Sequence, residues 1–115
     1  MVKQTKLRSR ESDLVKGILD YLRLRKDVIA WRQNTGATRI GDRFIRYGLV
    51  GQPDITGIII GGYRLDIECK VKGGRLSAEQ AKYREQAKAM KSCYILAYCI
   101  EDVKAALDDF KMWRL

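Results

Sequence analysis

Two runs rich in β-branched residues, separated by two glycines, are the feature of this sequence that most constrains its fold. The runs are Asp54–Ile60 and Tyr63–Val71, with Gly61-Gly62 between them. Runs of this length and composition predict strands, and a Gly-Gly pair predicts a tight antiparallel hairpin. We therefore expect a fold built around a β-sheet in which these two strands are neighbours.

The remaining patterns place helices and further strands on either side of this hairpin. Helical spacing of apolar residues predicts a helix from Ser9 or Arg10 to about Arg25, after a basic tail over residues 1–9. The capping box Ser77-Ala-Glu-Gln80 opens a second helix that ends near Lys91. The other expected elements are strands at Val28–Trp31, Arg43–Tyr47 and Cys93–Cys99, a Gly-rich polar loop at Gln33–Asp42, and a helix from Asp102 to about Met112. This order, α–β–β–β–β–α–β–α over 115 residues, predicts a single α/β domain.

Composition narrows the chemistry that such a domain can perform. The chain has no histidine, and its three cysteines, Cys69, Cys93 and Cys99, show no Cys-x-x-Cys spacing. Serine–histidine hydrolases, histidine–metal nucleases and zinc fingers are therefore excluded, and a disulfide framework is not expected. Lysine and arginine outnumber aspartate and glutamate by 23 to 14, a net charge of +9. This excess indicates a polyanionic partner, with a basic surface tuned for solubility as the alternative.

Membrane and secretion signals are not expected in this chain. The longest apolar stretch, Ile55–Ile60, is far shorter than the ~20 residues that a membrane span needs. The first ten residues are basic but lack the apolar core of a signal peptide. We expect a cytoplasmic protein that binds no membrane.

Glu68 and Lys70 are the first candidates for chemistry. Because side chains alternate along a strand, both project from one face of the predicted strand Tyr63–Val71. A carboxylate beside an ammonium group could hold a metal ion and position a water. The same spacing also occurs by chance, as at Asp102–Lys104, and a solvated strand face is the alternative interpretation.

Asp54 is a second candidate carboxylate. It follows Pro53, the only proline, at the start of the strand that pairs with Tyr63–Val71, although Pro-Asp is also ordinary turn chemistry. A two-residue hairpin connection would place Asp54 opposite Cys69, on the face away from Glu68. A site shared by Asp54 and Glu68 therefore requires an odd number of connecting residues, or a bulge before Asp54.

Glu11 and Gln80 are two further polar candidates for a functional site. Glu11 shares a helical stripe with Val15, Ile18 and Leu22, where a carboxylate is costly unless it meets a cation or a metal. The alternative is a first helical turn that frays into solvent, where a carboxylate favours the helix dipole. Gln80 occupies the reach-back position of the capping box, which by itself explains its presence.

Taken together, these residues resemble the VRR-NUC (virus-type replication–repair nuclease) family of PD-(D/E)XK nucleases. The resemblance covers about residues 10–110, and its motifs are Glu11, Trp31-Arg-Gln-Asn34-Thr-Gly36, Gly48-Leu-Val-Gly51-Gln-Pro-Asp54, Glu68-Cys-Lys70 and Leu76-Ser-Ala-Glu-Gln80. Ala78 stands where the family often has proline. The resemblance implies an α/β core with a central mixed sheet flanked by helices, and a divalent-metal-dependent DNA endonuclease.

The resemblance also implies a role for each motif residue. Asp54 and Glu68 would bind Mg²⁺ or Mn²⁺ with the backbone carbonyl of Cys69, and Glu11 would complete the metal shell directly or through water. Lys70 would orient and activate the attacking water, and Gln80 would support the site. Hard oxygen ligands of this kind suit Mg²⁺. The candidate DNA contacts are Arg32, Asn34, Arg39, Arg43, Lys72 and Arg75.

A chain of this length resembles the stand-alone, phage-type members, which act on branched DNA, including four-way junctions, in bacterial or phage-infected cells. Resolving a junction takes two symmetric nicks, which favours a homodimer. Apolar residues at the end of the chain either cap the domain or meet a partner; they are Phe110, Met112, Trp113 and Leu115. The alternatives are a flap, single-strand or general DNA endonuclease, and a non-catalytic basic module that binds nucleic acid. A metal-independent RNA endonuclease is disfavoured because the chain has no histidine.

Overall fold

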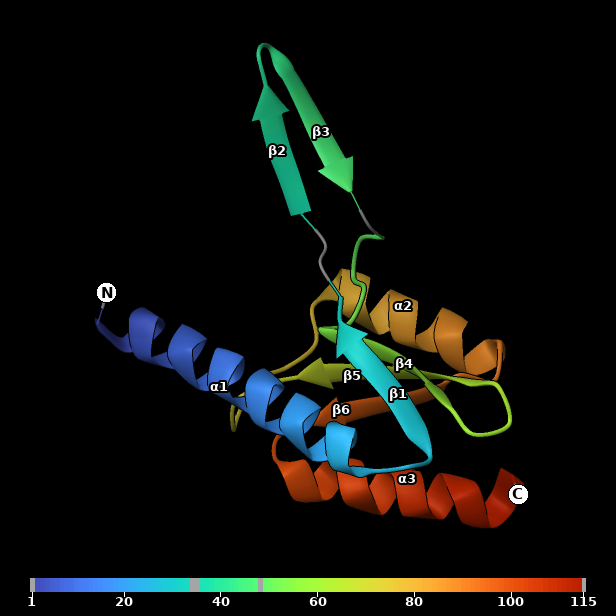
Figure 1. Cartoon of the computed structure of the whole chain (residues 1–115). Coiled ribbons are helices and arrows are strands. Elements are labelled where there is room, and N and C mark those ends of the chain that lie inside the picture. Colours follow the sequence, from blue (N-terminus) through green and yellow to red (C-terminus); the bar gives the residue numbers. More distant parts are fainter. Residues whose placement is uncertain (1, 34–35, 48, 115) are drawn as a thin grey trace.

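The chain folds into three helices and six strands over the residues that the computed structural model describes. Backbone is described for residues 2–33, 36–47 and 49–114, and side chains for 10–33, 40–43 and 49–111. The elements are α1 (Val2–Leu24), β1 (Val28–Arg32), β2 (Gly36–Ile40), β3 (Arg43–Tyr47), β4 (Ile55–Ile59), β5 (Tyr63–Cys69), α2 (Ala78–Ala89), β6 (Cys93–Ala97) and α3 (Ile100–Arg114) (Figure 1). The α/β class predicted from the sequence is confirmed.

Four of the strands form one mixed sheet in the order β1-β4-β5-β6. β4 pairs antiparallel with β1 and with β5, whereas β5 and β6 are parallel. The helices α1 and α3 cover one face of this sheet and α2 covers the other (Figure 1). The hydrophobic core lies on the α1 and α3 side, and its members are Val15, Ile18, Leu19, Leu22, Val28, Ile55, Ile59, Leu65, Ile67, Cys69, Cys93, Ile95, Ala97, Val103 and Leu107.

The first helix is longer than the sequence pattern predicts. The predicted stripe is confirmed, because Val15, Ile18 and Leu22 are each at most 2% exposed. The helix begins at Val2, however, and not at Ser9 or Arg10, so the expected basic tail is helical backbone. Lysine, arginine, glutamine and leucine in this segment are good helix formers, and neither glycine nor proline interrupts it before Gly17.

The expected Gly-rich loop at Gln33–Asp42 is the main error in the predicted element order. Residues Gly36–Ile40 form β2, which pairs antiparallel with the expected strand β3 as a separate two-stranded hairpin. Gly41 has a φ of +61° at the turn, which a glycine adopts without strain. The hairpin projects away from the rest of the molecule (Figure 1). Its polar sequence lacks the apolar alternation of a half-buried strand, which explains the error.

The connection between β4 and β5 differs from the expected two-residue hairpin. Ile59 is paired with Tyr63, so three residues connect the strands: Ile60, Gly61 and Gly62. Both glycines have φ near +90°, at +97° and +87°. The connection is therefore odd in length, which is the condition that a site shared by Asp54 and Glu68 requires.

The C-terminal part of the chain follows the predicted order with small shifts of boundaries. The capping box of α2 is confirmed with both of its hydrogen bonds, and α3 begins at Ile100, before the expected Asp102. Phe110 is partly buried and packs edge-on against Tyr63, with ring centroids 5.2 Å apart, so it caps the domain. Met112, Trp113 and Leu115 lie outside the described side chains.

In the described part of the chain, no helix combines the length and the apolar character needed to cross a membrane.

Candidate active site

Asp54 and Glu68 come together at one end of the central sheet. Ile55 pairs with Ile67, and continuing this register by one residue places Asp54 opposite Glu68. The backbone N–H of Cys69 donates a 2.9 Å hydrogen bond to Oδ2 of Asp54. Asp54, the residue directly before β4, is thereby fixed against the end of β5, the strand that carries Glu68.

Glu68 is a buried carboxylate with one oxygen left unpaired. Its side chain is only 4% exposed, and Oε1 has no hydrogen-bond partner among the described residues. Its pKa is raised to about 8, first by burial and then by the negative charge of Asp54, while the charge of Lys70 opposes the rise. A cation at this point would favour the ionised form of Glu68 and satisfy its free oxygen.

Lys70 follows the last residue of β5 and lies on the same side as Glu68. Its Nζ is 3.8 Å from Oε2 of Glu68, and its side chain is only 16% exposed. The backbone N–H of Lys70 donates to the carbonyl oxygen of Ala97 at 3.0 Å, which extends the pairing with β6 to this point. The ammonium group is thus held beside the carboxylate by a fixed backbone, at the distance of an ion pair.

Gln80 connects the start of α2 with Glu68. Its Oε1 accepts a 2.8 Å hydrogen bond from the backbone N–H of Ser77, which is half of the capping box. Its Nε2 donates to Oε2 of Glu68 at 3.3 Å. The capping box alone does not account for Gln80, because the same amide also holds one oxygen of the buried carboxylate.

Glu11 is nearby but less closely engaged. It lies half-buried on α1, and its negative charge adds a small further rise to the pKa of Glu68, whose main cause is burial. Among the described residues, no group of three or more aspartate, glutamate, cysteine or histidine side chains is arranged to hold a metal ion. The structure therefore brings together two carboxylates, an ammonium group and an amide, with Glu11 at their margin.

The fit of a hard divalent cation rests on this pair of carboxylates. Mg²⁺ is commonly held by one or two carboxylates, with waters and substrate phosphates completing its shell. Asp54 and Glu68 supply that number, and the unpaired Oε1 of Glu68 is an orphaned buried acceptor. The backbone carbonyl of Cys69 belongs to the same strand end. The donor set therefore fits Mg²⁺ or Mn²⁺.

Gly51 was not singled out as a site residue from the sequence, although it lies in the motif that ends at Asp54. Its φ is +81°, and a Cβ at this position would lie 2.3 Å from the carbonyl oxygen of Glu79. Only glycine allows the loop before Asp54 to approach the start of α2 this closely. This contact brings Asp54 and Gln80 into one assembly, and its signal in the sequence was a glycine three residues before the aspartate.

Asp66 also lies on the α2 face and is completely buried. It accepts hydrogen bonds from the Ser92 hydroxyl at 2.6 Å and the Tyr83 hydroxyl at 3.1 Å, and Arg64 Nε lies 3.2 Å away. These partners satisfy its charge and fasten α2 and the start of β6 to β5. Asp66 is therefore a structural carboxylate, in contrast to Glu68 two residues further along.

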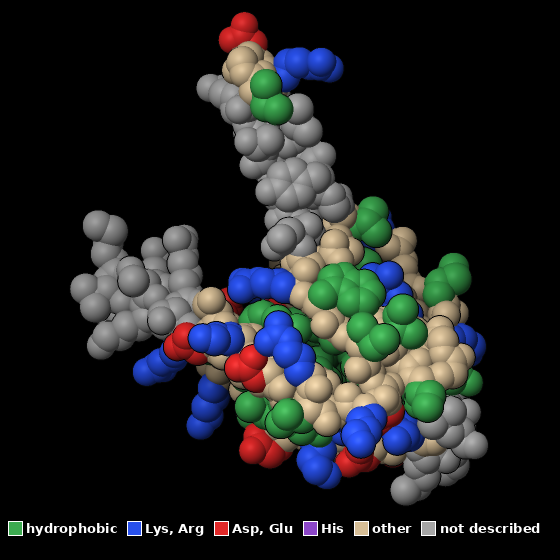
Figure 2. Space-filling view, viewed as in Figure 1, with side chains coloured by type: hydrophobic (Ala, Val, Ile, Leu, Met, Phe, Trp, Pro, Cys, Tyr) green, Lys and Arg blue, Asp and Glu red, His purple; other side chains and the backbone are tan. Residues whose placement is uncertain are grey.

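The candidate DNA contacts are spread around this end of the molecule. Arg32 is exposed at the end of β1. Burial raises the pKa of the Cys69 thiol, and the charge of Arg32 opposes that rise. Lys72 and Arg75 are exposed in the segment between β5 and α2. Arg43 is exposed at the turn of the β2–β3 hairpin (Figure 2). Asn34 lies outside the described residues, and Arg39 is a β2 residue whose side chain is not described.

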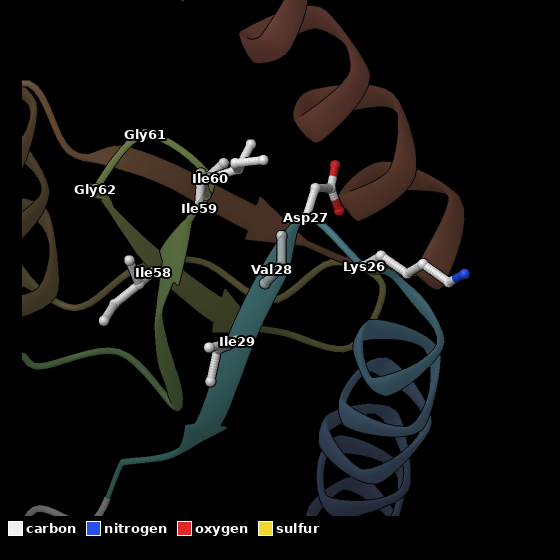
Figure 3. Close-up of a pocket in the computed structure, with 9 residues that line it drawn as sticks. All are labelled: Lys26, Asp27, Val28, Ile29, Ile58, Ile59, Ile60, Gly61 and Gly62. Atoms are coloured by element: carbon white, nitrogen blue, oxygen red, sulfur yellow. The ribbon is translucent and has the colours of Figure 1, made fainter.

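A pocket of about 280 Å³ lies at the other end of the sheet and is distinct from this site (Figure 3). It is lined mainly by aliphatic side chains of β1, β4 and the turn after β4. Its carboxylate, Asp27, is held by Arg25 at 2.9 Å and Lys111 at 3.0 Å, and the hydrogen bond from Arg25 is the main cause that lowers its pKa. The pocket therefore offers an apolar wall and a carboxylate that is already paired.

Comparison of the sequence with models of known protein families finds no match, and comparison with curated proteins finds none either.

Proposed function

We propose that this chain is a divalent-metal-dependent DNA endonuclease of the PD-(D/E)XK type, similar to the VRR-NUC nucleases, that cuts branched DNA. The observation that carries the proposal is the convergence of Asp54, Glu68 and Lys70 at one end of β4 and β5. Their order along the chain, aspartate before the hairpin and Glu-x-Lys after it, is the order that the family resemblance implies. The four-stranded mixed sheet with flanking helices is compatible with this assignment.

The residues that would hold the metal are Asp54 and Glu68, with the Cys69 carbonyl, and with Glu11 acting directly or through a water. A bound Mg²⁺ would supply a positive charge that stabilises the phosphate and lowers the pKa of a bound water. Gln80 would keep Oε2 of Glu68 in place, which leaves Oε1 available as a ligand.

Lys70 would act on the nucleophile and on the phosphate. Its ammonium group carries hydrogen-bond donors and a positive charge beside Glu68, so it can orient a water and offset the negative charge of the scissile phosphate. Hydrolysis adds this water to phosphorus and breaks one P–O bond, so a strand is nicked. The net charge of +9 favours the DNA substrate, with Arg32, Lys72 and Arg75 as exposed contacts close to the site.

Action on four-way junctions would involve a homodimer, because two sites related by a twofold axis can place symmetric nicks. Phe110 does not support a dimer interface at the C-terminus, since it packs on Tyr63 within the domain. The dimer is therefore proposed from the symmetry of the substrate.

A second candidate function is a non-catalytic basic module that binds nucleic acid. One observation favours it: the net charge of +9 suits a polyanionic partner whether or not that partner is cut. The two proposals differ in whether a metal ion leads to cleavage, and DNA binding alone does not separate them.

The decisive experiment is a cleavage assay on flap, fork, four-way junction and linear DNA with Mg²⁺, Ca²⁺ or EDTA. We expect cleavage of branched DNA with Mg²⁺, and binding with little cleavage in Ca²⁺. Lys70→Ala and Asp54→Asn should lower turnover by about 10²–10⁴-fold while DNA binding persists. Lys88→Ala is the matched control, because it removes the same charge from an exposed position on α2 and should keep the wild-type turnover.

Three results would contradict the proposal: cleavage that persists in EDTA, normal turnover by Lys70→Ala, or binding of all substrates without any cleavage in Mg²⁺. The last of these would establish the non-catalytic module.

A further inference from the structure

The β2–β3 hairpin, called the arm below, is a second cationic region that begins directly at the candidate site. The backbone N–H of Gln33, three residues before β2, donates a 2.8 Å hydrogen bond to the carbonyl oxygen of Asp54, seven residues after β3. The chain segment that carries the arm is thus closed by a backbone hydrogen bond to the residue proposed to bind the metal. From there the arm projects away from the sheet (Figure 1).

The arm lacks the support that other strands receive. It is a separate two-stranded sheet, and a hairpin of this kind is at best marginally stable on its own in water. The four residues of its turn whose side chains are described, Ile40, Gly41, Asp42 and Arg43, are all exposed, and Ile40 is 62% exposed (Figure 2). A bound partner would therefore bury surface that the rest of the chain leaves uncovered.

The composition of the arm indicates the chemistry of that partner. Residues 36–47 contain three arginines, Arg39, Arg43 and Arg46, and one acidic residue, Asp42, so the arm carries a net charge of +2. Arg39 is paired with Phe44 and Ala37 with Arg46, whereas Arg43 is paired with Ile40. Because positions alternate between the faces of a hairpin, arginine positions occur on both faces.

We propose that the arm binds the sugar–phosphate backbone of the DNA at a distance from the phosphate that is cut. Guanidinium groups match phosphate oxygens in a two-pronged geometry, which suits a segment whose cations are all arginine. A second copy of the chain is the weaker candidate, because each copy carries +9 and would bring cations against cations. This inference rests on the proposed function for the identity of the nucleic acid as DNA.

The length of the arm sets the position of these contacts. Five residues of β2 extend about 17 Å at ~3.4 Å per residue. One DNA strand rises about 3.4 Å per nucleotide along the duplex. The arginines near the turn of the arm would therefore meet the DNA backbone about five nucleotides from the cleaved bond, within one branch of the substrate.

The test is the salt dependence of DNA binding, measured with a short fluorescent duplex and a four-way junction in EDTA, so that no cleavage occurs. The arm variant is Arg39→Ala/Arg43→Ala/Arg46→Ala. The slope of the logarithm of the association constant K against the logarithm of the salt concentration is negative. The loss of three phosphate contacts should reduce its magnitude by about 2–3 between about 50 and 200 mM salt. The conservative variant Arg39→Lys/Arg43→Lys/Arg46→Lys keeps the charge and should retain most of the slope.

The matched control is Arg23→Ala/Lys26→Ala/Lys88→Ala, which also removes three positive charges. All three residues are exposed, and Arg23 and Lys26 precede Val28, which pairs with Ile59 at the end of the sheet away from Asp54. We expect the control to change the slope by less than half as much. Thermal unfolding of each variant verifies that the body remains folded.

Equal slope changes in the arm and control variants would overturn the proposal, as would an arm variant that binds like the wild type. A drop from dimer to monomer with an unchanged slope would also overturn it, and would show that the arm docks on a second copy. These measurements need no cleavage, so they test the arm separately from the nuclease function. The arm proposal can fail although the wild type cuts DNA with Mg²⁺, and it can hold although the wild type does not.

Discussion

The two faces of the central sheet differ in what they bury. On the face covered by α1 and α3, the strand residues are apolar, and Leu65 and Ile67 of β5 are completely buried. On the face covered by α2, the alternate residues Asp66 and Glu68 are buried instead. Within α2, all of whose residues are described, none is buried. One strand therefore carries core packing on one side and charged groups on the other.

Because side chains alternate along a strand, the fold can place apolar residues on one face and charged groups on the other. Apolar burial on one face stabilises the sheet, so the other face can hold carboxylates that cost free energy when buried. Asp66 meets that cost with hydrogen bonds from Ser92 and Tyr83, whereas Glu68 keeps one oxygen unpaired. The missing hydrogen-bond partner at one oxygen makes Glu68 a candidate metal ligand, whereas the fully paired Asp66 is a structural carboxylate.

The strongest effect that we expect from this comparison is a loss of stability when a core residue of β5 is truncated. Ile67→Ala should lower the free energy of unfolding by about 2–5 kcal/mol, because it leaves a cavity in the core. Ile29→Ala is the control, because Ile29 lies in the same sheet but is 70% exposed, and its loss should cost less than about 0.5 kcal/mol. Urea denaturation measures both, and similar losses would show that packing is not confined to one face.

The main sheet and the carboxylate candidates were predictable because local patterns encode them. Alternation along β5 placed Glu68 and Lys70 on one face, and the helical stripe of α1 and the capping box of α2 are confirmed. Of the arm, β3 was predicted and β2 was missed, because the stretch that forms β2 shows no apolar alternation. Its pairing depends on cross-strand contacts and on the turn at Gly41, and a polar stretch shows these only weakly.

The geometry of the site was only conditionally predictable. A Gly-Gly pair permits a two- or a three-residue connection, and the choice decides whether Asp54 lies on the side of Glu68 or of Cys69. Packing of the neighbouring strands settles this register, and no local pattern reports it. The same holds for Gln80, whose second hydrogen bond depends on the approach of α2 to β5, and for Glu11, whose position depends on how α1 packs.

The next effect is a dependence of stability on pH that belongs to the α2 face. The pKa of Glu68 is raised from 4.5 to about 8 in the folded protein, so the folded state binds this proton more tightly than the unfolded state does. Without metal, its contribution to stability is complete below about pH 4.5 and is lost as the pH rises to about 8. Glu68→Gln should remove this loss, so the variant gains stability relative to the wild type from pH 5 to pH 8.

Urea denaturation across this pH range, without metal, makes the measurement. Mg²⁺ should reduce the loss in the wild type and leave the variant less affected, because a cation favours the ionised carboxylate. If the free energies of unfolding of the two proteins changed in parallel with pH, the pKa of Glu68 would not be raised in the folded protein. Glu68 would then not differ from Asp66 in the way proposed.

The smallest expected effect concerns Gln80, which joins helix capping to the candidate site. Gln80→Ala removes the hydrogen bonds to Ser77 and to Glu68, and should lower the free energy of unfolding by about 1 kcal/mol. Gln86→Ala, an exposed change on the same helix, is the control and should stay within about 0.5 kcal/mol. Gln80→Ala should also bind metal more weakly, because loss of a side chain that orients a metal ligand typically weakens metal binding by about 10–100-fold.

Mn²⁺ titration of both variants should therefore show weaker binding for Gln80→Ala alone. Equal Mn²⁺ affinity in the two variants, with the stability loss present, would assign Gln80 to the helix cap and remove it from the site.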